Sequence, residues 1–451
     1  MNGYKKSPSA PISRGASIWL DALYLLAAGL LIPYFIYRCL IKKKSSAPLR
    51  SKLGYIPERD NVPRVWIHAV SVGEAPAAET LFKALKRHRP ELDVVVSTTT
   101  VTGQSVAVKR YGENHSFYYP LDLSCSVKRA LDRVKPSALV LMELEIWPNM
   151  ISEATARDIP VVVVNGRITE RSFARYRRFW FLVGNSFRCV QHWLMQSDEY
   201  AARLKALGVE PARITIAGNI KYDAVDIEPT DLATRAALRE SLGIALDAPV
   251  LIGGSTHPTE ETALLAAYTY LRNGSAPRLR LILVPRHPER IKDVLAEIAA
   301  AGYAAILQSE LKEKGLVACL AALSPEKKDS CVLVINTVGE LKSMYRAADA
   351  AFIGGSLIPH GGQNIMEPCG LNVPVLHGPY MHNFNDAMSI LRACQGAREV
   401  TRETLISALE KLLANRQDAA AMAARAREGF LKAQGATEQA AQYVLAQIQN
   451  R

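Results

Sequence analysis

Phe-Ile-Gly-Gly-Ser-Leu-Ile-Pro-His-Gly-Gly-Gln-Asn-Ile-Met-Glu-Pro, residues 352–368, is the stretch that decides the fold. An apolar strand at residues 350–353 runs into two glycine pairs and then into a helical segment that opens at Asn364. Glycine lets the backbone approach a ligand closely, and a helix start offers unpaired N–H groups to a phosphate. The stretch therefore predicts a strand, a glycine-rich turn and a helix that together form a nucleotide pocket.

Six residues of this stretch are candidates for contact with a nucleotide: Gly355, Ser356, Asn364, Ile365, Met366 and Glu367. Glu367 lies one turn into the expected helix, where its carboxylate can accept hydrogen bonds from a ribose diol. The alternative is a tight strand–helix connection in which Asn364 and Glu367 form a pair that resembles a capping box. A cap does not need four glycines around a Ser and a His, so the nucleotide pocket is favoured.

Length, charge and cysteine content restrict the class of protein. A chain of 451 residues, 49% of them hydrophobic, can form two or three domains with full cores. The net charge of +12 indicates an anionic partner, which is nucleic acid, an anionic membrane surface or a phosphorylated substrate. The seven cysteines are scattered without paired spacing, which favours a reducing compartment and argues against disulfides or a metal site.

The N-terminal region has the pattern of a membrane anchor. Residues 22–37 carry no charge, and the basic residues 42–44 follow soon after. The apolar run is slightly shorter than the roughly 20 residues of a full span, and Pro33 keeps an interfacial or re-entrant segment open as the alternative. The positive charges place the large C-terminal body in the cytoplasm, against the bacterial inner membrane. We expect residues 1–41 only to localise the protein.

The rest of the chain alternates between apolar strands and helices, which predicts parallel sheets covered on both faces. After a basic linker at 42–63, the first half (64–225) has expected strands at 64–70, 93–98, 138–142, 161–165 and 193–195 and helices at 77–87 and 104–111. The second half (226–400) has expected strands at 250–254, 279–284, 332–335, 350–353 and 373–377 and helices at 260–272 and 291–301. A loop insertion is expected at 315–329, and a helical strap at 401–451. The fold class is thus α/β, with two doubly wound, Rossmann-like domains facing across a cleft.

Polar segments follow the expected strands, and ligands of such sheets bind at the carboxyl ends of strands. In the first half, Glu74 precedes a helix, where a lowered pKa would keep it ionised as a base, although it could simply complement the helix dipole. Glu143 and Glu145, at positions i and i+2 of an ending strand, are expected to point the same way. Lys221 lies near the domain junction and can stabilise a departing phosphate, with a solvated linker lysine as the alternative.

The second half has three further segments of this kind. Residues 253–257 form an expected anion cradle, after which Glu260 and Glu261 begin a helix. Pro285 and Arg286 end a strand, where the guanidinium suits a phosphate or a pyrimidine carbonyl. The loop that contains Val338, Gly339 and Glu340 offers free backbone N–H groups.

These motifs occur together at 71–74, 143–149, 165–167, 218–221, 253–255, 285–287, 338–340 and 361–367. In this combination the sequence closely resembles the membrane-anchored Kdo transferases of Gram-negative bacteria. That family moves 3-deoxy-D-manno-octulosonic acid (Kdo) from CMP-Kdo onto the lipid A precursor. The resemblance implies a GT-B fold, an inverting transfer without a metal or other cofactor, and a lipid acceptor between the first half and the membrane.

The resemblance also implies roles for individual residues. Glu74 matches the general base, and Glu145 and Lys221 match positions that stabilise the transition state. The CMP-binding segments correspond to Pro285 and Arg286, to Val338, Gly339 and Glu340, and to Asn364, Ile365, Met366 and Glu367. Three positions depart from the family pattern: Asn336 replaces an expected Asp, Gln363 an expected His, and Ile365 an expected Pro.

The same motifs are compatible with two other functions. A GT-B transferase that uses a UDP-sugar on another membrane lipid would share the fold, and a non-catalytic, two-lobed nucleotide-binding protein would need no base such as Glu74. A nucleic-acid partner is not expected, because no reading motif is present and much of the basic charge lies beside the anchor. The basic and aromatic residues 171–181 suit anionic lipid or acceptor phosphates, or form an ordinary amphipathic surface helix.

Overall fold

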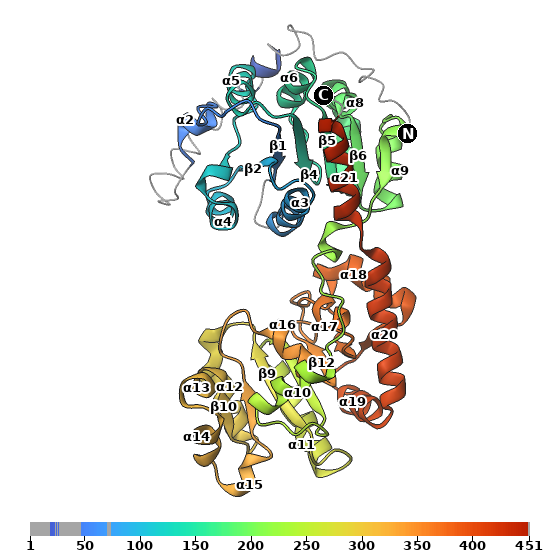
Figure 1. The fold of residues 1–451 in the computed structure, drawn as a ribbon. Helices are drawn as coiled ribbons and strands as arrows, with labels where there is room; N and C mark the ends of the chain where they lie inside the picture. Colours follow the sequence, from blue (N-terminus) through green and yellow to red (C-terminus); the bar gives the residue numbers. More distant parts are fainter. Residues whose placement is uncertain (1–18, 23, 25, 27–46, 70–73, 450–451) are drawn as a thin grey trace. The chain divides into compact units, whose positions relative to one another are not determined.

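The computed structural model describes residues 19–22, 24, 26, 47–69 and 74–449. The chain forms two compact units, of which the first comprises Met1–Ala224 and Ala433–Arg451 and the second Val225–Lys432. Each unit contains a seven-stranded sheet in which every paired strand is parallel (Figure 1). This confirms the expected α/β class with two doubly wound sheets.

The first unit has the strand order β3-β2-β1-β4-β5-β6-β7. Its strands are β1 (Arg64–His68), β2 (Asp93–Thr98), β3 (Ser116–Tyr118), β4 (Ala138–Met142), β5 (Val161–Gly166), β6 (His192–Met195) and β7 (Ile214–Ile216). Its helices are α2 (Leu49–Lys52), α3 (Ala75–His88), α4 (Val101–Tyr111), α5 (Ser124–Val134), α6 (Pro148–Ala156), α7 (Glu170–Arg178), α8 (Trp180–Cys189), α9 (Asp198–Ala206) and α21 (Ala436–Gln449), with 3-10 turns η1 (Glu113–His115), η2 (Pro211–Arg213) and η3 (Ile220–Tyr222).

Two apolar cores cover the two faces of this sheet. Successive residues of a strand point to opposite faces, so Trp66 of β1 lies in one core and Ile67 in the other. The second of these cores joins Leu81 of α3 to Val444 of α21, a helix from the far end of the chain. Figure 1 shows α21 in red within the otherwise blue and green first unit. Burial on both faces explains why the central strands are continuous apolar runs.

The second unit has the strand order β10-β11-β9-β8-β12-β13-β14. Its strands are β8 (Val250–Thr256), β9 (Arg280–Pro285), β10 (Ala305–Leu307), β11 (Val332–Val334), β12 (Ala350–Ile353), β13 (Val375–His377) and β14 (Arg398–Glu399). Its helices are α10 (Leu232–Ser241), α11 (Glu260–Asn273), α12 (Ile291–Ala300), α13 (Gln308–Lys314), α14 (Leu316–Ala321), α15 (Pro325–Lys328), α16 (Leu341–Met344), α17 (Met366–Gly370), α18 (Asn385–Cys394), α19 (Leu405–Ala414) and α20 (Arg416–Ala433), with 3-10 turns η4 (Pro288–Arg290), η5 (Tyr345–Ala347) and η6 (His382–Phe384).

Two parts of the structure differ from expectation. Residues 315–329 are not a plain loop insertion, because they form the short helices α14 and α15, and Cys319 of α14 is buried. The edge strands β3, β7, β10 and β14 were not expected, since two or three residues are too few to show a strand periodicity.

The expected anchor helix falls largely outside the described residues. Within the described parts of the chain, no helix has the length and apolar character needed to cross a membrane. Residues 19–22, 24 and 26 are described and helical, and they contact the first unit through side chains that are discussed below.

Candidate active site

Glu74 and Glu145, the expected base and the expected transition-state residue, influence each other electrostatically in the first unit. Glu74 immediately precedes α3, is only 7% exposed, and its side chain does not cap that helix. Glu145 lies in the loop between β4 and α6. Burial, followed by the negative charges of Glu74 and Glu143, raises the pKa of Glu145 to about 7. The structure therefore brings the two expected catalytic carboxyl groups close enough for the charge of one to affect the pKa of the other.

The geometric expectation for Glu143 and Glu145 is wrong, because neither residue belongs to a strand. β4 ends at Met142, and Glu143 has a φ of 56°, which turns the chain out of the extended conformation. In the loop that follows, Leu144 and Ile146 pack against the core of the sheet. The two acidic residues are thus held by a loop with apolar anchors, and not by strand alternation.

Two buried aromatic rings lie beside this loop. His68 ends β1 and stacks on Tyr119 with ring centroids 3.7 Å apart, and Tyr119 lies 5.3 Å from Trp147. The His68 Nδ1 atom is 3.0 Å from Ser97 Oγ, and burial lowers the pKa of His68 to about 3, so its ring is neutral. Tyr119 was not recognised in the sequence, because its closeness to Glu145 arises only when β3 joins the sheet edge.

Two polar atoms of these rings are buried without a partner. Among the described residues, His68 Nε2 and Tyr119 Oη have no hydrogen-bond partner. Burial raises the pKa of Tyr119 far above its usual range, and the charges of Asp122 and Glu145 add to the effect. Other buried polar atoms of the described residues share this property, among them Trp193 Nε1 and Thr437 Oγ1, so it does not by itself mark a ligand site.

Lys221 is exposed and lies in η3, which packs against α3, the helix that follows Glu74. The Lys221 backbone N–H donates to Asn219 Oδ1 at 3.0 Å, and the Ile220 N–H donates to Asn165 Oδ1 at 3.1 Å. Asn165 has a φ of 59° at the end of β5. The motifs at 165–167 and 218–221 are therefore joined, and together they fix the backbone from which the Lys221 ammonium extends.

In the second unit, the glycine-rich turn after β12 is filled by a carboxylate of the protein itself. Glu260 is fully buried and accepts hydrogen bonds from the backbone N–H groups of His257, Gly355, Ser356 and Leu357, at 3.0, 2.7, 3.0 and 2.9 Å. The backbone N–H groups of Gly355 and Ser356 are therefore already bonded to Glu260, so any contact of these two residues with a nucleotide would have to use other atoms. The same bonds tie the expected cradle at 253–257 to this turn.

Close packing also explains the glycines. A Cβ atom on Gly354 would lie 2.0 Å from the carbonyl oxygen of Ser255, and Gly355 has a φ of 66°. Any side chain at Gly354 would therefore push β8 and β12 apart at their carboxyl ends. This glycine pair builds the floor of the turn, whether or not a ligand is bound.

Asn364 and Glu367 form a pair at the start of α17. Asn364 Oδ1 accepts from the Met366 N–H at 3.1 Å, and Asn364 Nδ2 donates to Glu367 Oε1 at 2.9 Å. Burial raises the pKa of Glu367, while the bond from Asn364 opposes that rise. Ile365 is buried beside them. The alternative of a cap formed by Asn364 and Glu367 is thus partly realised. In this pair Asn364 orients the Oε1 atom of Glu367, and the Oε2 atom is not part of that bond.

Arg286 presents a guanidinium to solvent at the end of β9. Its backbone N–H donates to the Thr256 carbonyl oxygen at 2.9 Å, and Pro285 before it is buried. The sequence indicated this position as a ligand contact. The structure adds that Arg286 is one of the charges that lower the pKa of the nearby His257.

Three histidines gather next to this strand end. The ring of His257 lies 4.2 Å from that of His360 and 5.7 Å from that of His287. Burial, followed by the charges of these two histidines, lowers the pKa of His257 to about 4. Gln363 Nε2 lies 3.2 Å from His257 Nε2, so the unusual Gln363 has a defined partner. The sequence contained these residues, but their clustering depends on the meeting of three loops.

The loop after β11 is open at its tip and anchored at both ends. Val338 is 88% exposed, and Gly339 has a φ of 89° with open space around it. Glu340 accepts hydrogen bonds from Gln308 Nε2 at 3.1 Å and Lys312 Nζ at 2.5 Å. Asn336 accepts from the Ser309 N–H and donates to Ser309 Oγ, at 3.0 and 2.8 Å, which gives this departure from the family pattern a structural role.

Comparison with solved structures supports the class of protein that these features define. A glycosyltransferase from Rickettsia africae aligns with 87% of this chain and all of its own, with a TM-score of 0.53 at 10% sequence identity. That likeness concerns the fold alone. Two parallel α/β units of this kind, with polar loops at their strand ends, are the architecture of GT-B glycosyltransferases.

Sequence relatives then identify the family. Residues 47–224 match the family model described as 3-deoxy-D-manno-octulosonic-acid transferase (kdotransferase). The 3-deoxy-D-manno-octulosonic acid transferase of Haemophilus influenzae is 33% identical over 356 residues, which cover 78% of this chain and 80% of that protein. The Bordetella pertussis transferase is 31% identical over 373 residues, covering 80% and 82%. This chain belongs to the Kdo transferase family and is a glycosyltransferase, as its motifs indicated.

Proposed function

We propose that this protein transfers Kdo from CMP-Kdo to the lipid A precursor, with inversion at the anomeric carbon, in lipopolysaccharide synthesis. The observation that carries this proposal is the electrostatic pair of Glu74 and Glu145 in the first unit. A non-catalytic binding protein would need no general base, whereas Glu74 matches the position of the base in the family and lies close enough to Glu145 to influence its pKa.

Glu74 is the proposed general base. In the transfer, the acceptor hydroxyl oxygen forms a bond to the anomeric carbon of Kdo while the bond from that carbon to the phosphate oxygen of CMP breaks. Glu74 takes the hydroxyl proton, and CMP leaves with the bonding electron pair. Attack opposite to the leaving group inverts the anomeric centre. Glu145 can hold a proton near pH 7, which reduces repulsion within the pair before substrate arrives.

The oxocarbenium character of the transition state gives Glu145 its proposed role. Positive charge on the anomeric carbon favours the ionised form of a nearby carboxylate, so Glu145 stabilises the transition state more than the ground state. Lys221 is the proposed partner of the leaving phosphate, because its ammonium is exposed on a backbone fixed by Asn165 and Asn219.

The second unit is the proposed CMP-binding side. Arg286 offers a planar fork to the phosphate or to the cytosine carbonyl, and Glu367 accepts from the ribose diol. Glu367→Ala should raise the Kd for CMP by roughly 10- to 100-fold, since a hydrogen bond to a charged group contributes about 1.5–3 kcal/mol. Arg286→Lys should also weaken binding. Unchanged CMP affinity in Glu367→Ala would contradict the ribose assignment.

The loop of Val338, Gly339 and Glu340 is proposed to lie against the base of the nucleotide. Its open tip has backbone groups available, whereas its ends are fixed on α13. A UDP-sugar enzyme of the same fold would need different contacts to the base. Calorimetric titration with CMP, UMP and UDP tests this, and tighter binding of UDP than of CMP would favour the alternative.

The membrane is the proposed place of action. The N-terminal residues 1–41 are proposed to anchor the protein to the cytoplasmic face of the inner membrane. The helix α7 presents Arg171, Arg175, Arg177 and Arg178 to solvent, and Phe181 at the start of α8 is 80% exposed. Arginine charge beside exposed aromatic rings suits a headgroup region. Phe181→Ala should reduce cosedimentation with anionic vesicles, and unchanged cosedimentation would support an ordinary surface helix.

A further inference from the structure

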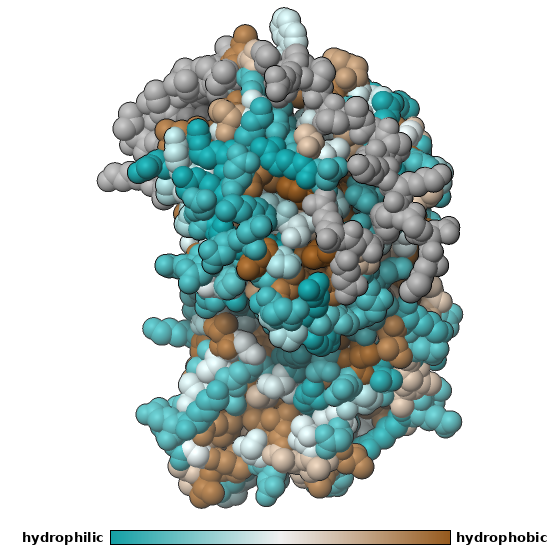
Figure 2. Space-filling model, turned by 45° about the horizontal axis from the view of Figure 1, so that its top comes forward, coloured by the Kyte–Doolittle hydropathy of each residue, from teal (hydrophilic) through white to brown (hydrophobic). Residues whose placement is uncertain are grey.

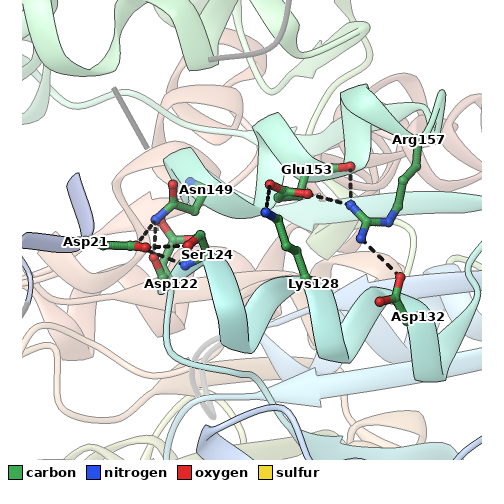
Figure 3. A network of polar contacts seen from close by, with 8 residues as sticks. All are labelled: Asp21, Asp122, Ser124, Lys128, Asp132, Asn149, Glu153 and Arg157. Atoms are coloured by element: carbon green, nitrogen blue, oxygen red, sulfur yellow. Dashed lines mark hydrogen bonds and ion pairs between the residues drawn. The ribbon is translucent and has the colours of Figure 1, made fainter. Parts of the chain in front are cut away.

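The described N-terminal residues make partly buried hydrogen bonds to the first unit. The carboxylate of Asp21 accepts from the Ser124 N–H and from Asn149 Nδ2, each at 2.9 Å, and from the Ser124 hydroxyl. Tyr24 Oη donates to Asp122 Oδ2 at 3.1 Å. Figure 3 shows Asp21, Asp122, Ser124 and Asn149 converging at one end of two helices.

These two helices lack caps of their own. The residue before α5 is Leu123 and the residue before α6 is Trp147, and neither makes a side-chain capping bond. Asp21, 103 residues away from Ser124, binds the first N–H of α5. An anion at the start of a helix offsets unpaired N–H groups and the positive end of the dipole. The N-terminal segment therefore supplies a cap that the local sequence of α5 does not provide.

Asp122 does the same for α6. It is buried and accepts from the backbone N–H groups of Asn149 and Met150, at 3.0 and 2.8 Å. Pro148 has no N–H, so these are the first donors of the helix. Burial raises the pKa of Asp122 to about 7, while those two backbone bonds and the Tyr24 hydroxyl oppose the rise. Tyr24 thus supports the carboxylate that fixes the start of α6.

The two helices are also joined along their length. Lys128 of α5 lies 3.5 Å from Glu153 of α6, and Arg157 of α6 reaches both Glu153, at 2.6 Å, and Asp132 of α5, at 3.1 Å (Figure 3). α5 and α6 therefore behave as one packed pair, with its ends set by Asp21 and Asp122. The loop that ends at the start of α6 is the loop that holds Glu145.

We propose that Asp21 and Tyr24 are positioning residues for transfer, because they fix the start of α6 and with it the loop that carries Glu145. The N-terminal segment is then part of the catalytic unit and does more than localise the protein. This proposal rests on the proposed role of Glu145. It departs from the expectation that residues 1–41 only localise the protein, since a chain that begins near residue 42 lacks both side chains.

The test uses the full-length protein in detergent with Asp21→Asn and Tyr24→Phe. The Asp21→Asn substitution removes the carboxylate charge and places an amide group opposite the donors of Ser124 and Asn149. We expect kcat to fall on the order of tenfold or more in Asp21→Asn and less in Tyr24→Phe, because small displacements of a reacting group are costly. The KM for CMP-Kdo and the Kd for CMP should stay within about twofold, because those contacts lie in the second unit.

Asp231→Ala is the matched control. Asp231 caps α10 of the second unit through the Thr234 N–H at 2.8 Å and is exposed, so its loss costs stability of the usual size for a cap. A wild-type kcat in Asp21→Asn, or an equal fall of kcat in Asp231→Ala, would overturn the proposal. Glu145→Gln distinguishes failure of the positioning role from failure of the proposed role of Glu145. If Glu145→Gln keeps its activity, the proposed role of Glu145 is wrong. If Glu145→Gln is inactive and Asp21→Asn is fully active, only the positioning role is contradicted.

Discussion

Glu145 has a titration that follows from its surroundings. Its carboxyl group is partly buried and faces negative charge from Glu74 and from Glu143, so ionisation is disfavoured and its pKa is raised to about 7. If ionised Glu145 stabilises the transition state, kcat/KM should rise with pH through this pKa and level off above it. Activity is then lost as the pH falls, when Glu145 takes up its proton.

Glu143→Gln tests this relation without removing either proposed catalytic carboxylate. Loss of the Glu143 charge makes ionisation of Glu145 easier, so its pKa should fall and the acid limb of kcat/KM should move to lower pH. The measurement is the pH profile of kcat/KM from about pH 5.5 to about pH 8.5 for both proteins, a range that brackets the raised pKa. An acid limb that stays in place would show that another group controls it.

Glu260 is the residue whose role is most different from what its sequence position suggests. It begins α11 as an acidic residue often does, but its carboxylate is fully buried and held by four backbone N–H groups. Burial raises its pKa, and those bonds counteract the rise. Its carboxylate therefore occupies the backbone N–H groups of the glycine-rich turn from within the protein.

Glu260→Ala should destabilise the second unit strongly. The change leaves buried N–H groups unsatisfied, and each is worth about 1–3 kcal/mol, so the loss should be at least about 3 kcal/mol. All five tryptophans lie between residues 19 and 193, so tryptophan fluorescence follows the first unit only. Urea unfolding by circular dichroism should show an earlier second-unit transition, with the fluorescence transition unchanged.

Glu310→Ala provides the comparison for Glu260→Ala. Glu310 is an acidic residue of the same unit whose side chain is 40% exposed and pairs with Lys314 at 3.2 Å. Because such a surface pair contributes little, its loss should change stability by less than about 0.5 kcal/mol. Equal effects of the two substitutions would show that the buried hydrogen bonds of Glu260 contribute little.

At the level of elements, central strands were predictable and edge strands were not. The expected strands 93–98, 138–142 and 350–353 coincide with β2, β4 and β12, since burial on both faces demands continuous apolar residues. β14 has only Arg398 and Glu399, both exposed, so it carries no apolar signal. Its strand state comes from pairing with β13, a tertiary effect.

Sequence could predict which loops follow the strands of each sheet. Parallel strands bring their carboxyl ends to one edge of a sheet, and Glu145 follows β4 in the first unit while Arg286 follows β9 in the second. The filling of the glycine-rich turn by Glu260 could not be read from sequence, because it depends on the approach of α11 to that turn. Asp21, which caps α5, is 103 residues away from Ser124 in the sequence, so this contact is equally non-local.

α21 is the element whose removal should matter most to the first unit. Val444, Leu445 and Ile448 are buried against the face that α3 covers, and burial of each contributes about 1.5–3 kcal/mol. Asp223 caps the helix through the Gly435 and Thr437 N–H groups, each at 2.6 Å. A chain that ends at Gln434 should lose its cooperative tryptophan transition.

Point substitutions in α21 test the same assignment if the chain that ends at Gln434 does not express. Val444→Ala should lower the stability of the first unit by about 2 kcal/mol. The exposed Gln442→Ala, on the same helix, should change it by less than about 0.5 kcal/mol. A tryptophan transition that is unaffected by both Val444→Ala and the truncation would contradict the assignment of α21 to this core.

For the whole molecule, the net charge of +12 agrees with a substrate that is anionic. The chain has 55 Lys and Arg residues against 43 Asp and Glu residues. On the face that Figure 2 shows, hydrophilic residues predominate and hydrophobic residues form smaller groups between them. CMP-Kdo and a phosphorylated lipid acceptor are both anionic, so the positive net charge of the protein would attract both proposed substrates.

The most direct test of the account is product analysis by mass spectrometry, with tetra-acylated lipid A precursor and freshly made CMP-Kdo as substrates. The wild-type protein should add Kdo to the lipid. Glu74→Gln should reduce the rate on the order of 10²–10⁴ while CMP affinity and melting temperature stay close to wild type. Undiminished Kdo transfer by Glu74→Gln would contradict the account, since the base would then be a residue other than Glu74.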